Sequence, residues 1–428
     1  MVFVSKNVNN QINSSLPKNK SSINAIYISS YIPRKCGIAT FTNDLVSAIN
    51  RLNIGNPAEM IAMTDNGQSY EYTADVKREI KQLVKSDYEK AADYINKSAA
   101  NIVNLQHEFG LYRVSEGNAT CCLSAGAKGP DDSNAIIDEG TYLLDMLRKV
   151  TKPIVTTFHT ILSNPDNRQI YEMSKLIELS SAVIAMTETS KKTLIRVYGC
   201  PLEKVKVICH GVPDFLYNES KKYQKKLGII KADPMILAAG LLGPGKGLEY
   251  TINAMPSIVK AAPNAKLFIV GQTHPVIIKN EGEVYREKLI QLIAKNKVTD
   301  NVVFVNRYLA GGDLFDYFQA ADFFVTPYSN MQQSASGTLA WALGAGKICV
   351  STPYQYAREM LADGAGILVR QKSSVAISRS IINAFNDPKL KESIHKKAYS
   401  RGHKSIWSNV AAQYAELFGQ CIEQNSIK

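Results

Sequence analysis

The sequence lacks the features of membrane-spanning and secreted proteins. No apolar run approaches the ~20 residues that a membrane-spanning helix needs, and the apolar patch Met1–Val4 is too short for the core of a signal peptide. The seven cysteines are odd in number and include no CxxC pair, which argues against a disulfide framework and a zinc site. Glycine and proline contents near the average exclude collagen-like and low-complexity architectures. We therefore expect a cytoplasmic protein.

Positive charge is what the sequence has in excess. Its 428 residues include 50 Lys and Arg against 38 Asp and Glu, a formal charge of +12. Such an excess suits nucleic acid, an anionic membrane surface or a negatively charged small substrate. With 45% hydrophobic and 21% charged residues, the chain can bury sizeable cores, and its length allows two or three domains of ~150 residues.

Short apolar runs alternate with helical patterns in two series along the chain. The runs are rich in Val and Ile, and their apolarity is continuous, which indicates parallel strands buried on both faces. The first series consists of Ile23–Ser30, Met60–Thr64, Ile102–Gln106, Ile154–Phe158, Ala182–Met186 and Val205–Cys209. The second consists of Met235–Ala239, Lys266–Val270, Val302–Val305, Asp322–Thr326, Ile348–Ser351 and Gly366–Val369. This alternation predicts two doubly wound α/β domains.

The pattern also predicts the domain limits. We expect a disordered tail at 1–22, a first domain at 23–215 and a second at 216–403, followed by a C-terminal helix within 404–428. A stretch of weak periodicity, 112–139, is expected to be a flexible insertion of unknown role. The C-terminal helix has a one-faced apolar stripe, which must dock on its own domain or on the other.

Because open α/β sheets bind ligands at the carboxyl ends of their strands, the segments that follow the strands are the candidate sites. After the first strand, Cys36–Ala39 predicts a short turn that opens a helix over Thr40–Leu52. Gly37 lets a ligand approach the backbone, the helix start attracts an anion, and Arg34 adds charge. The alternative is a simple tight turn with a threonine cap.

Two histidines follow two neighbouring strands of the first domain. His107 and Glu108 come after Ile102–Gln106, and His159 comes after Ile154–Phe158. The pair predicts a polar cleft, although each histidine could equally be a satisfied structural residue. Their spacing is not that of metal ligands, and no third ligand is evident.

The glycine-rich segment Gly240–Glu249 gives the sharpest signal in the second domain. A strand, a glycine-rich turn with Gly243 and Gly245, Lys246 and then a helix together make a phosphate cradle. It is not a P-loop, because Gly247 follows the lysine. The alternative is a glycine-rich loop with a solvated lysine.

A second loop of this domain leads into a helix with small residues. Ser336, Gly337 and Thr338 follow the strand Asp322–Thr326, and the helix after them presents a small face. Small residues permit the close approach of a ligand, and tight helix–sheet packing explains part of this pattern.

Together these motifs resemble the family 4 retaining glycosyltransferases of GT-B fold, over residues 23–425. The resemblance rests on PRKCGIATFT, QHEFG, TTFHT, GLLGPGKGLE, NRYL and TPYSNMQQSASGTLAWALGAGK. Within the family, the chain is similar to a bacterial subgroup with the pattern PRxCGIATFT. It implies two Rossmann-like domains facing a cleft, a C-terminal helix that crosses back to the first domain, and hexosyl transfer (EC 2.4 class) without a metal or other cofactor.

The resemblance also implies roles for individual residues. The second domain would hold the nucleotide-sugar and the first domain the acceptor, while protein charges and helix ends stabilise the leaving diphosphate. The implied positions are Gly37, Gly243, Gly245 and Lys246 for the diphosphate, Ser336, Gly337 and Thr338 for the sugar and ribose, Arg307 and Tyr308 near the nucleotide, His107 and Glu108 on the acceptor side, and His159 and Gln332 for catalysis.

The sequence departs from the family pattern at two places. The arginine that many members carry about five residues before the lysine is replaced by Leu241 or Leu242, and Arg307 is a candidate substitute. Two glutamates of many members are replaced by Gln332 and Ala340. The leading hypothesis is a hexosyltransferase using a GDP- or UDP-hexose, and the alternative is a nucleotide-sugar-binding protein with little turnover.

The expected partners follow from these motifs and from the charge. The acceptor is a saccharide or a lipid-linked molecule, and basic residues outside the cleft could hold the protein against the anionic inner face of a membrane. Nucleic acid is not expected, because clustered aromatic–basic motifs are lacking.

Overall fold

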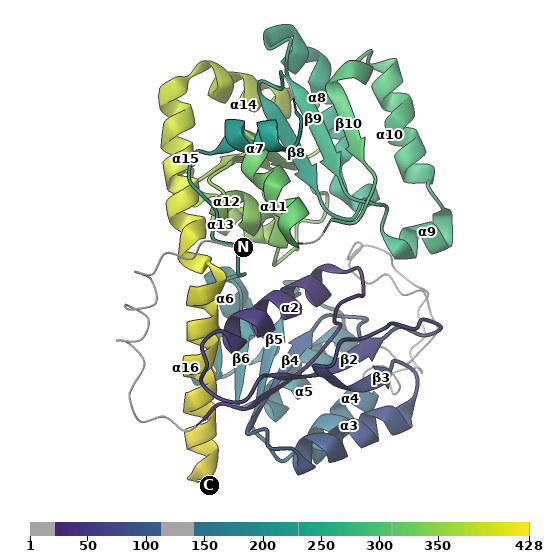
Figure 1. Ribbon diagram of the computed structural model, residues 1–428, viewed down its shortest axis with the longest axis vertical. Helices are drawn as coiled ribbons and strands as arrows, with labels where there is room; N and C mark the ends of the chain where they lie inside the picture. The colour runs from purple at the N-terminus through teal and green to yellow at the C-terminus, as the bar shows by residue number, and fades with distance from the viewer. Residues whose placement is uncertain (1–21, 113–140, 230, 310, 428) are drawn as a thin grey trace.

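The chain forms two α/β domains, one above the other in Figure 1. The computed structural model describes residues 22–112, 141–229, 231–309 and 311–427. Apart from Ser22 and the buried Tyr112, the expected tail and the expected flexible insertion lie outside the described residues.

The first domain is built on a seven-stranded parallel sheet with the strand order β3-β2-β1-β4-β5-β6-β7. The strands are β1 Ala25–Ser29, β2 Glu59–Thr64, β3 Val76–Lys81, β4 Ile102–His107, β5 Ile154–Phe158, β6 Ala182–Ala185 and β7 Val205–Val207. Strands β1, β4, β5 and β6 are buried along their whole length, as their continuous apolarity predicts. The strand order reverses between β1 and β4, so ligands are expected at the carboxyl ends of these two strands.

The second domain is built on a six-stranded parallel sheet with the order β10-β9-β8-β11-β12-β13. Its strands are β8 Met235–Ala239, β9 Lys266–Val270, β10 Val302–Val305, β11 Phe323–Thr326, β12 Ile348–Ser351 and β13 Ile367–Leu368. Here the strand order reverses between β8 and β11. Each domain therefore has one switch point of its own.

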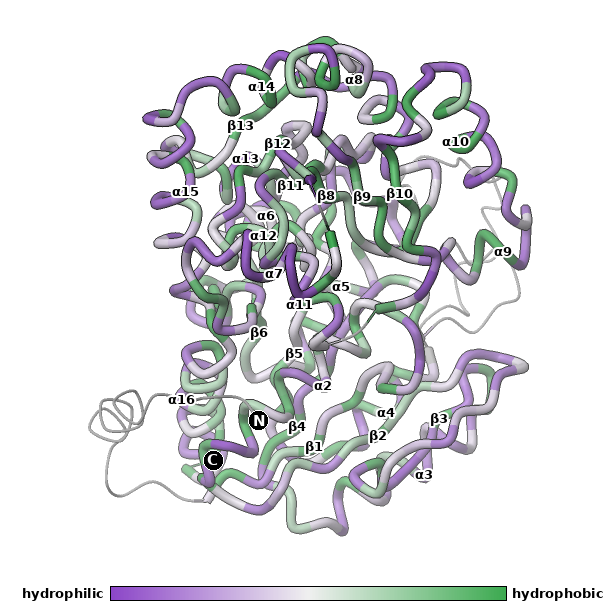
Figure 2. The backbone as a smooth tube through the Cα atoms, turned by 45° about the horizontal axis from the view of Figure 1, so that its top comes forward, coloured by the Kyte–Doolittle hydropathy of each residue, from purple (hydrophilic) through white to green (hydrophobic). Residues whose placement is uncertain are grey.

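Helices cover both faces of each sheet and leave the apolar strands inside, where the tube in Figure 2 is mostly green. In the first domain they are α2 Gly37–Asn50, α3 Lys85–Lys97, α4 Thr141–Lys149, α5 Asn167–Leu179 and α6 Glu188–Tyr198. In the second they are α7 Ser220–Lys226, α8 Leu248–Ala261, α9 Pro275–Glu281, α10 Val284–Lys295, α11 Gly311–Ala320, α12 Gly337–Gly344, α13 Gln355–Met360, α14 Ser374–Asn386 and α15 Pro388–Gly402. In the described part of the chain, no helix is both long and apolar enough to cross a membrane.

The structure corrects the expected start of the first helix. We predicted a turn over Cys36–Ala39 and a helix from Thr40, but α2 begins at Gly37. Cys36 has extended backbone angles, and its Sγ accepts a hydrogen bond from the Ala39 N–H at 3.3 Å. The cap is therefore a cysteine and not a threonine, and the helix start lies closer to β1 than expected.

The C-terminal helix α16, Trp407–Ser426, follows the last helix of the second domain and packs against the first, as the yellow helix at the left of Figure 1 shows. Tyr414 and Phe418 are buried in one cluster with Phe41 and Leu45 of α2, and the hydroxyl groups of Tyr414 and Thr157 are 3.0 Å apart. The predicted crossover helix is thus confirmed.

The chain crosses between the domains twice, and the two crossings are joined. The Val212 N–H donates to the Ser405 carbonyl at 2.9 Å, and the Trp407 N–H donates to the Val212 carbonyl at 3.0 Å. These bonds form a short parallel bridge between Val212 and Ile406.

Candidate functional site

The glycine-rich loop after β8 is held in place by close backbone contacts. Gly240 has φ +120° and Gly271 has φ +142°, and a Cβ on Gly271 would lie 2.0 Å from the Gly240 carbonyl oxygen. Gly247 is left-handed, and a Cβ there would lie 2.2 Å from the Pro327 carbonyl oxygen. Only glycine fits at these contacts, so the predicted phosphate loop is a rigid element wedged between the ends of β9 and β11.

The side chains around this loop form a small cavity. Lys246 Nζ lies 4.2 Å from the centre of the Tyr328 ring, close enough for a cation–π contact. The cavity is lined by Gly240, Leu242, Lys246 and Tyr328, among others. A Cβ on Gly240 would lie 3.6 Å from Cγ2 of Thr338. The structure therefore brings the two candidate loops of the second domain together.

The Ser336–Thr338 loop is the N-terminus of α12. Ser336 caps the helix by accepting a hydrogen bond from the Leu339 N–H at 3.4 Å, and the Thr338 and Tyr328 hydroxyl groups lie 3.3 Å apart. Ala340 is buried in the core beneath this loop, and its methyl side chain has no polar group that could bind a ligand.

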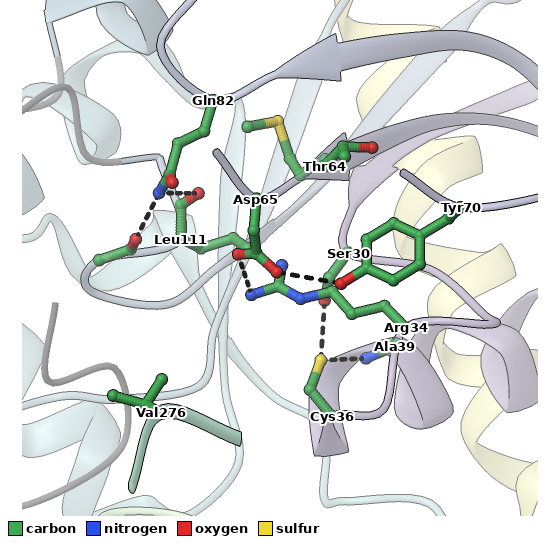
Figure 3. Close-up of polar contacts among 12 residues, drawn as sticks. Ser30, Arg34, Cys36, Ala39, Thr64, Asp65, Tyr70, Gln82, Leu111 and Val276 are labelled. Carbon is green, nitrogen blue, oxygen red and sulfur yellow. Dashed lines mark hydrogen bonds and ion pairs between the residues drawn. The ribbon is translucent and has the colours of Figure 1, made fainter. Parts of the chain in front are cut away.

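The turn before α2 contacts the second domain. The Tyr308 hydroxyl lies 2.9 Å from Thr40 Oγ1 and donates to the Cys36 carbonyl at 3.4 Å. A Cβ on Gly37 would meet no atom within 4 Å, so the helix start borders open space. Arg34 pairs with Asp65 at 2.7 Å, and Asp65 also accepts from the Tyr70 hydroxyl, as Figure 3 shows.

The two predicted histidines lie at adjacent strand ends, joined by a bond from the His159 N–H to the His107 carbonyl at 2.9 Å. His107 is fully buried and its Nε2–H donates to Glu172 at 2.8 Å. The His159 Nε2–H donates to the Gln106 Oε1 at 2.8 Å. Burial, helped by His210 and His107, lowers the pKa of His159 to about 3. His159 is therefore neutral near pH 7.

Glu108 lies beside these histidines in a buried position. Its carboxylate accepts from the Thr160 hydroxyl at 2.9 Å and from the Phe109 N–H at 3.0 Å. Burial raises the pKa of Glu108 to about 7, against the opposing effects of these bonds and of His107. A carboxyl group that is half protonated near neutral pH can donate or accept a proton.

A third histidine, His210, was missed by the sequence analysis. Its ring packs edge-on against Phe41, which also contacts His159 and Trp407. The Nδ1–H donates to the Gly211 carbonyl at 2.8 Å, and a Cβ on Gly337 would lie 2.8 Å from Nε2. His210 thus touches the start of α12 from the first domain. Its position after β7, the last strand of its sheet, was the available signal.

Gln332 makes contacts between the domains. Its Oε1 accepts from the Asn164 N–H at 2.9 Å and from the Ser163 hydroxyl at 3.1 Å. Nearby, Ser334 Oγ accepts from the Ile161 N–H at 2.8 Å. In this arrangement the side-chain oxygen of Gln332 is bonded to the first domain.

Arg307 points to the surface. Its side chain is 62% exposed and pairs with Asp313 at 3.6 Å. The described residues thus show Arg307 with an acidic partner on α11, while Tyr308 beside it contacts Thr40 of the first domain.

The fold defines a class, and the comparisons define a family within it. Two parallel Rossmann-like sheets with a C-terminal helix that crosses back make a GT-B fold, as in sucrose-phosphate synthase from Thermosynechococcus elongatus (TM-score 0.70, 16% identity, 94% of this chain and 100% of that one). Anabaena HepE, solved in complex with UDP and glucose, has a TM-score of 0.67 at 15% identity, over 92% of this chain and 99% of its own.

The family models agree with the fold. Residues 219–401 match the model "Glycosyl transferases group 1", and residues 137–214 match the model "Glycosyltransferase Family 4". The chain belongs to the group 1 and family 4 glycosyltransferases, retaining enzymes that use nucleotide-sugars.

Relatives with curated names are distant. An uncharacterized glycosyltransferase of Methanocaldococcus jannaschii is 26% identical over 271 residues, which are 61% of this chain and 66% of that one. The phosphatidyl-myo-inositol mannosyltransferase of Mycolicibacterium smegmatis is 23% identical over 78% of this chain and 83% of its own. The match to the archaeal protein thus spans about two thirds of its length.

Proposed function

We propose that the protein transfers a hexosyl group from a GDP- or UDP-hexose to an acceptor hydroxyl, with retention of the anomeric configuration. The observation that carries this proposal is the rigid glycine-rich loop with Lys246, next to Thr338 and the Tyr328 ring. Loop N–H groups, a helix start and one lysine suit a diphosphate. The relatives supply both candidate bases, since HepE was solved with UDP and a relative from Corynebacterium glutamicum is named as GDP-mannose-dependent.

The residue roles form part of the same proposal. Gly243, Gly245 and Lys246 would hold the diphosphate from the second domain, and Gly37 would reach it from the first. The hydroxyl groups of Ser336 and Thr338 would meet the sugar and ribose, and Tyr308 would lie near the nucleotide. The neutral ring of His159 would contact the transferred sugar, while His107 and Glu108 would line the acceptor side.

The test is a panel of UDP-, GDP- and ADP-hexoses measured by thermal unfolding. A ligand at about 100 times its Kd adds about 2.7 kcal/mol to the free energy of unfolding, so the correct donor should raise Tm by several degrees. Lys246→Ala should abolish this rise without lowering the Tm of the free protein. Product anomers read by NMR then test retention. If no donor raises Tm, the proposed donor site is wrong.

A second candidate function is nucleotide-sugar binding with little turnover. The hydrogen bonds that Gln332 Oε1 accepts from Ser163 and Asn164 favour it, because they engage this oxygen in the domain interface. Donor hydrolysis and transfer assays with purified protein separate the two functions. Tight donor binding without either reaction would support the binding protein.

The acceptor is proposed to be a saccharide or a lipid-linked molecule. Exposed lysines of α15, such as Lys389, Lys396 and Lys397, could contact an anionic membrane where a lipid-linked acceptor resides. Co-sedimentation with vesicles of phosphatidylglycerol and phosphatidylcholine should then fall steeply as salt is raised. Equal binding to pure phosphatidylcholine would argue against the membrane contact.

A further inference from the structure

The segment that links β9 to α9 lies directly against the glycine-rich loop. The Leu242 N–H donates to the Gln272 carbonyl at 2.9 Å, and the His274 N–H donates to the Leu242 carbonyl at 2.9 Å. Leu242 and Thr273 thereby form a short parallel bridge. His274 is therefore a fixed neighbour of the loop that presents Lys246.

This segment is also held from behind. Arg286, 6% exposed, donates from Nη2 to the Gly271 carbonyl at 3.1 Å and to Thr273 Oγ1 at 3.3 Å. Its Nε pairs with Glu283 at 3.2 Å, and Glu283 accepts a further hydrogen bond from the Thr273 hydroxyl. A buried arginine that binds the backbone in this way fixes the segment before any ligand arrives.

The hydrogen bonding of the His274 ring selects one tautomer. Its Nδ1 accepts a hydrogen bond from the Val276 N–H at 3.2 Å. An accepting Nδ1 carries no proton in the neutral ring, so the proton is on Nε2. The half-buried side chain thus offers a ligand an N–H donor with a defined position.

Charged groups of both domains surround this ring. Burial, then Lys246, then Arg34 lower the pKa of His274 to about 4, so the ring is neutral near pH 7. Arg34 comes from the turn before α2, where its partner is Asp65; Figure 3 shows this pair in the same view as Val276. Glu283, which pairs with Arg286, accepts a hydrogen bond from the neighbouring Thr273. The side facing Lys246 and Arg34 suits an anion.

We propose that His274 is a donor-contact residue whose Nε2–H binds a phosphate oxygen of the nucleotide-sugar diphosphate, between Lys246 and Arg34. The inference rests on the proposed function and adds a residue to its donor site. The contact lies beside Leu242, one of the two positions at which the expected arginine of the loop is missing. The neutral ring supplies this hydrogen bond without adding a third cation beside Lys246 and Arg34.

Two variants of His274 separate the ligand contact from the helix cap. In His274→Asn, the amide oxygen can keep the bond from the Val276 N–H, but the donor at the Nε2 position is lost. In His274→Gln, the amide NH2 can reach the Nε2 position. Binding of UDP and GDP to each variant is measured by calorimetry, and Tm is measured to compare folding.

We expect His274→Asn to lower the affinity for UDP or GDP, whichever the wild type binds, by about tenfold or more. This is the effect of losing one hydrogen bond to a charged group. His274→Gln should stay within about threefold of the wild type in affinity. His274→Asn should keep the wild-type Tm, whereas His274→Gln should lower it slightly because the cap bond from the Val276 N–H is lost. The loss should be absent for uridine and guanosine, which carry no phosphate.

Unchanged diphosphate affinity in His274→Asn would overturn the inference, as would an equal loss for the nucleosides. A wild type that binds neither UDP nor GDP would overturn it together with the donor site. If the expected binding pattern appears but no hexose is transferred to any acceptor, the proposed function fails while the His274 contact stands.

Discussion

At Gly37, a substitution to alanine can test ligand binding without disturbing the fold. It occupies the first position of α2, its φ is not in the left-handed region, and a Cβ would meet no protein atom within 4 Å. Alanine therefore fits the free protein and should be neutral or slightly stabilising. If a diphosphate approaches this backbone, the methyl group would occupy its place.

We predict that Gly37→Ala keeps the Tm of the wild type within about one degree or raises it, and weakens binding of the donor by about tenfold. Gly312→Ala, the same change in the first turn of α11, controls for the effect of alanine on a helix, because a Cβ there also meets no atom within 4 Å. Unchanged donor affinity in Gly37→Ala would place the diphosphate elsewhere.

Glu108 predicts a pH dependence of stability. Its folded pKa of about 7 lies above the ordinary glutamate pKa of 4.5, so the folded state binds more protons than the unfolded state between these values. The stability that Glu108 contributes is present at low pH and is lost as pH rises through this window, by up to about 1.4 kcal/mol per pH unit.

Glu108→Gln removes this titration. We expect its Tm relative to the wild type to rise between about pH 5 and pH 8. The histidines of the cleft are present in both proteins, so their own titrations largely cancel in the difference. A difference in Tm that stays constant with pH would show that Glu108 does not titrate in this range.

At the scale of elements, continuous apolar runs were the reliable signal of a strand. Strands β1, β4, β5, β8 and β11 were predicted because both of their faces are buried. Strand β3 was missed, since its sequence VKREIK is mostly polar and five of its six residues are not buried at the edge of the sheet. An edge strand buries too little to leave a continuous apolar run.

The candidate site was likewise predictable only where its residues follow a continuous apolar run. The glycine-rich loop and the histidines at the ends of β4 and β5 are visible in the sequence because they directly follow apolar runs. The same rule applied to the predicted strand Lys266–Val270 would have marked His274. The contacts of Gln332 with the first domain could not be predicted, because they depend on how closely the domains approach.

Helix α16 is expected to contribute strongly to the stability of the first domain. Phe418 is fully buried between α2 and the sheet, next to Tyr27 and Tyr414. Phe418→Ala should cost about 3–5 kcal/mol of the free energy of unfolding, measured in urea. Glu423→Ala, an exposed change on the same helix, should stay within about 0.5 kcal/mol. Equal effects of the two would mean that α16 does not stabilise the fold in solution.

At the scale of the molecule, the domains are held together by a second set of polar contacts. The Glu359 carboxylate accepts from the N–H groups of Glu188 and Thr189 at 2.9 and 2.8 Å, which places a negative charge at the start of α6. Gln355 donates to Ser190 at 3.3 Å beside it. These bonds and those of Gln332 favour the domain arrangement of this structure over one in which the domains lie further apart.

We predict that Glu359→Ala shifts the free protein toward an open arrangement. Its radius of gyration in small-angle X-ray scattering should rise, and saturating donor should reverse the rise. Donor affinity should fall several-fold, because closing the domains then costs free energy on binding. Glu423→Ala is the matched control. An unchanged radius of gyration would show that this contact does not hold the domains together.

The joined crossings at Val212 and Ile406 also constrain how the domains can move. The domains are connected by two chain segments that are joined by backbone hydrogen bonds, so we expect the connection to be stiffer than one formed by a single segment. We expect such a connection to favour rotation of the domains about one axis over twisting and sliding. The Gly240 loop and the Gly37 turn would then approach each other along one path. The alignment of these two segments would then depend on the chain connections and not on the ligand.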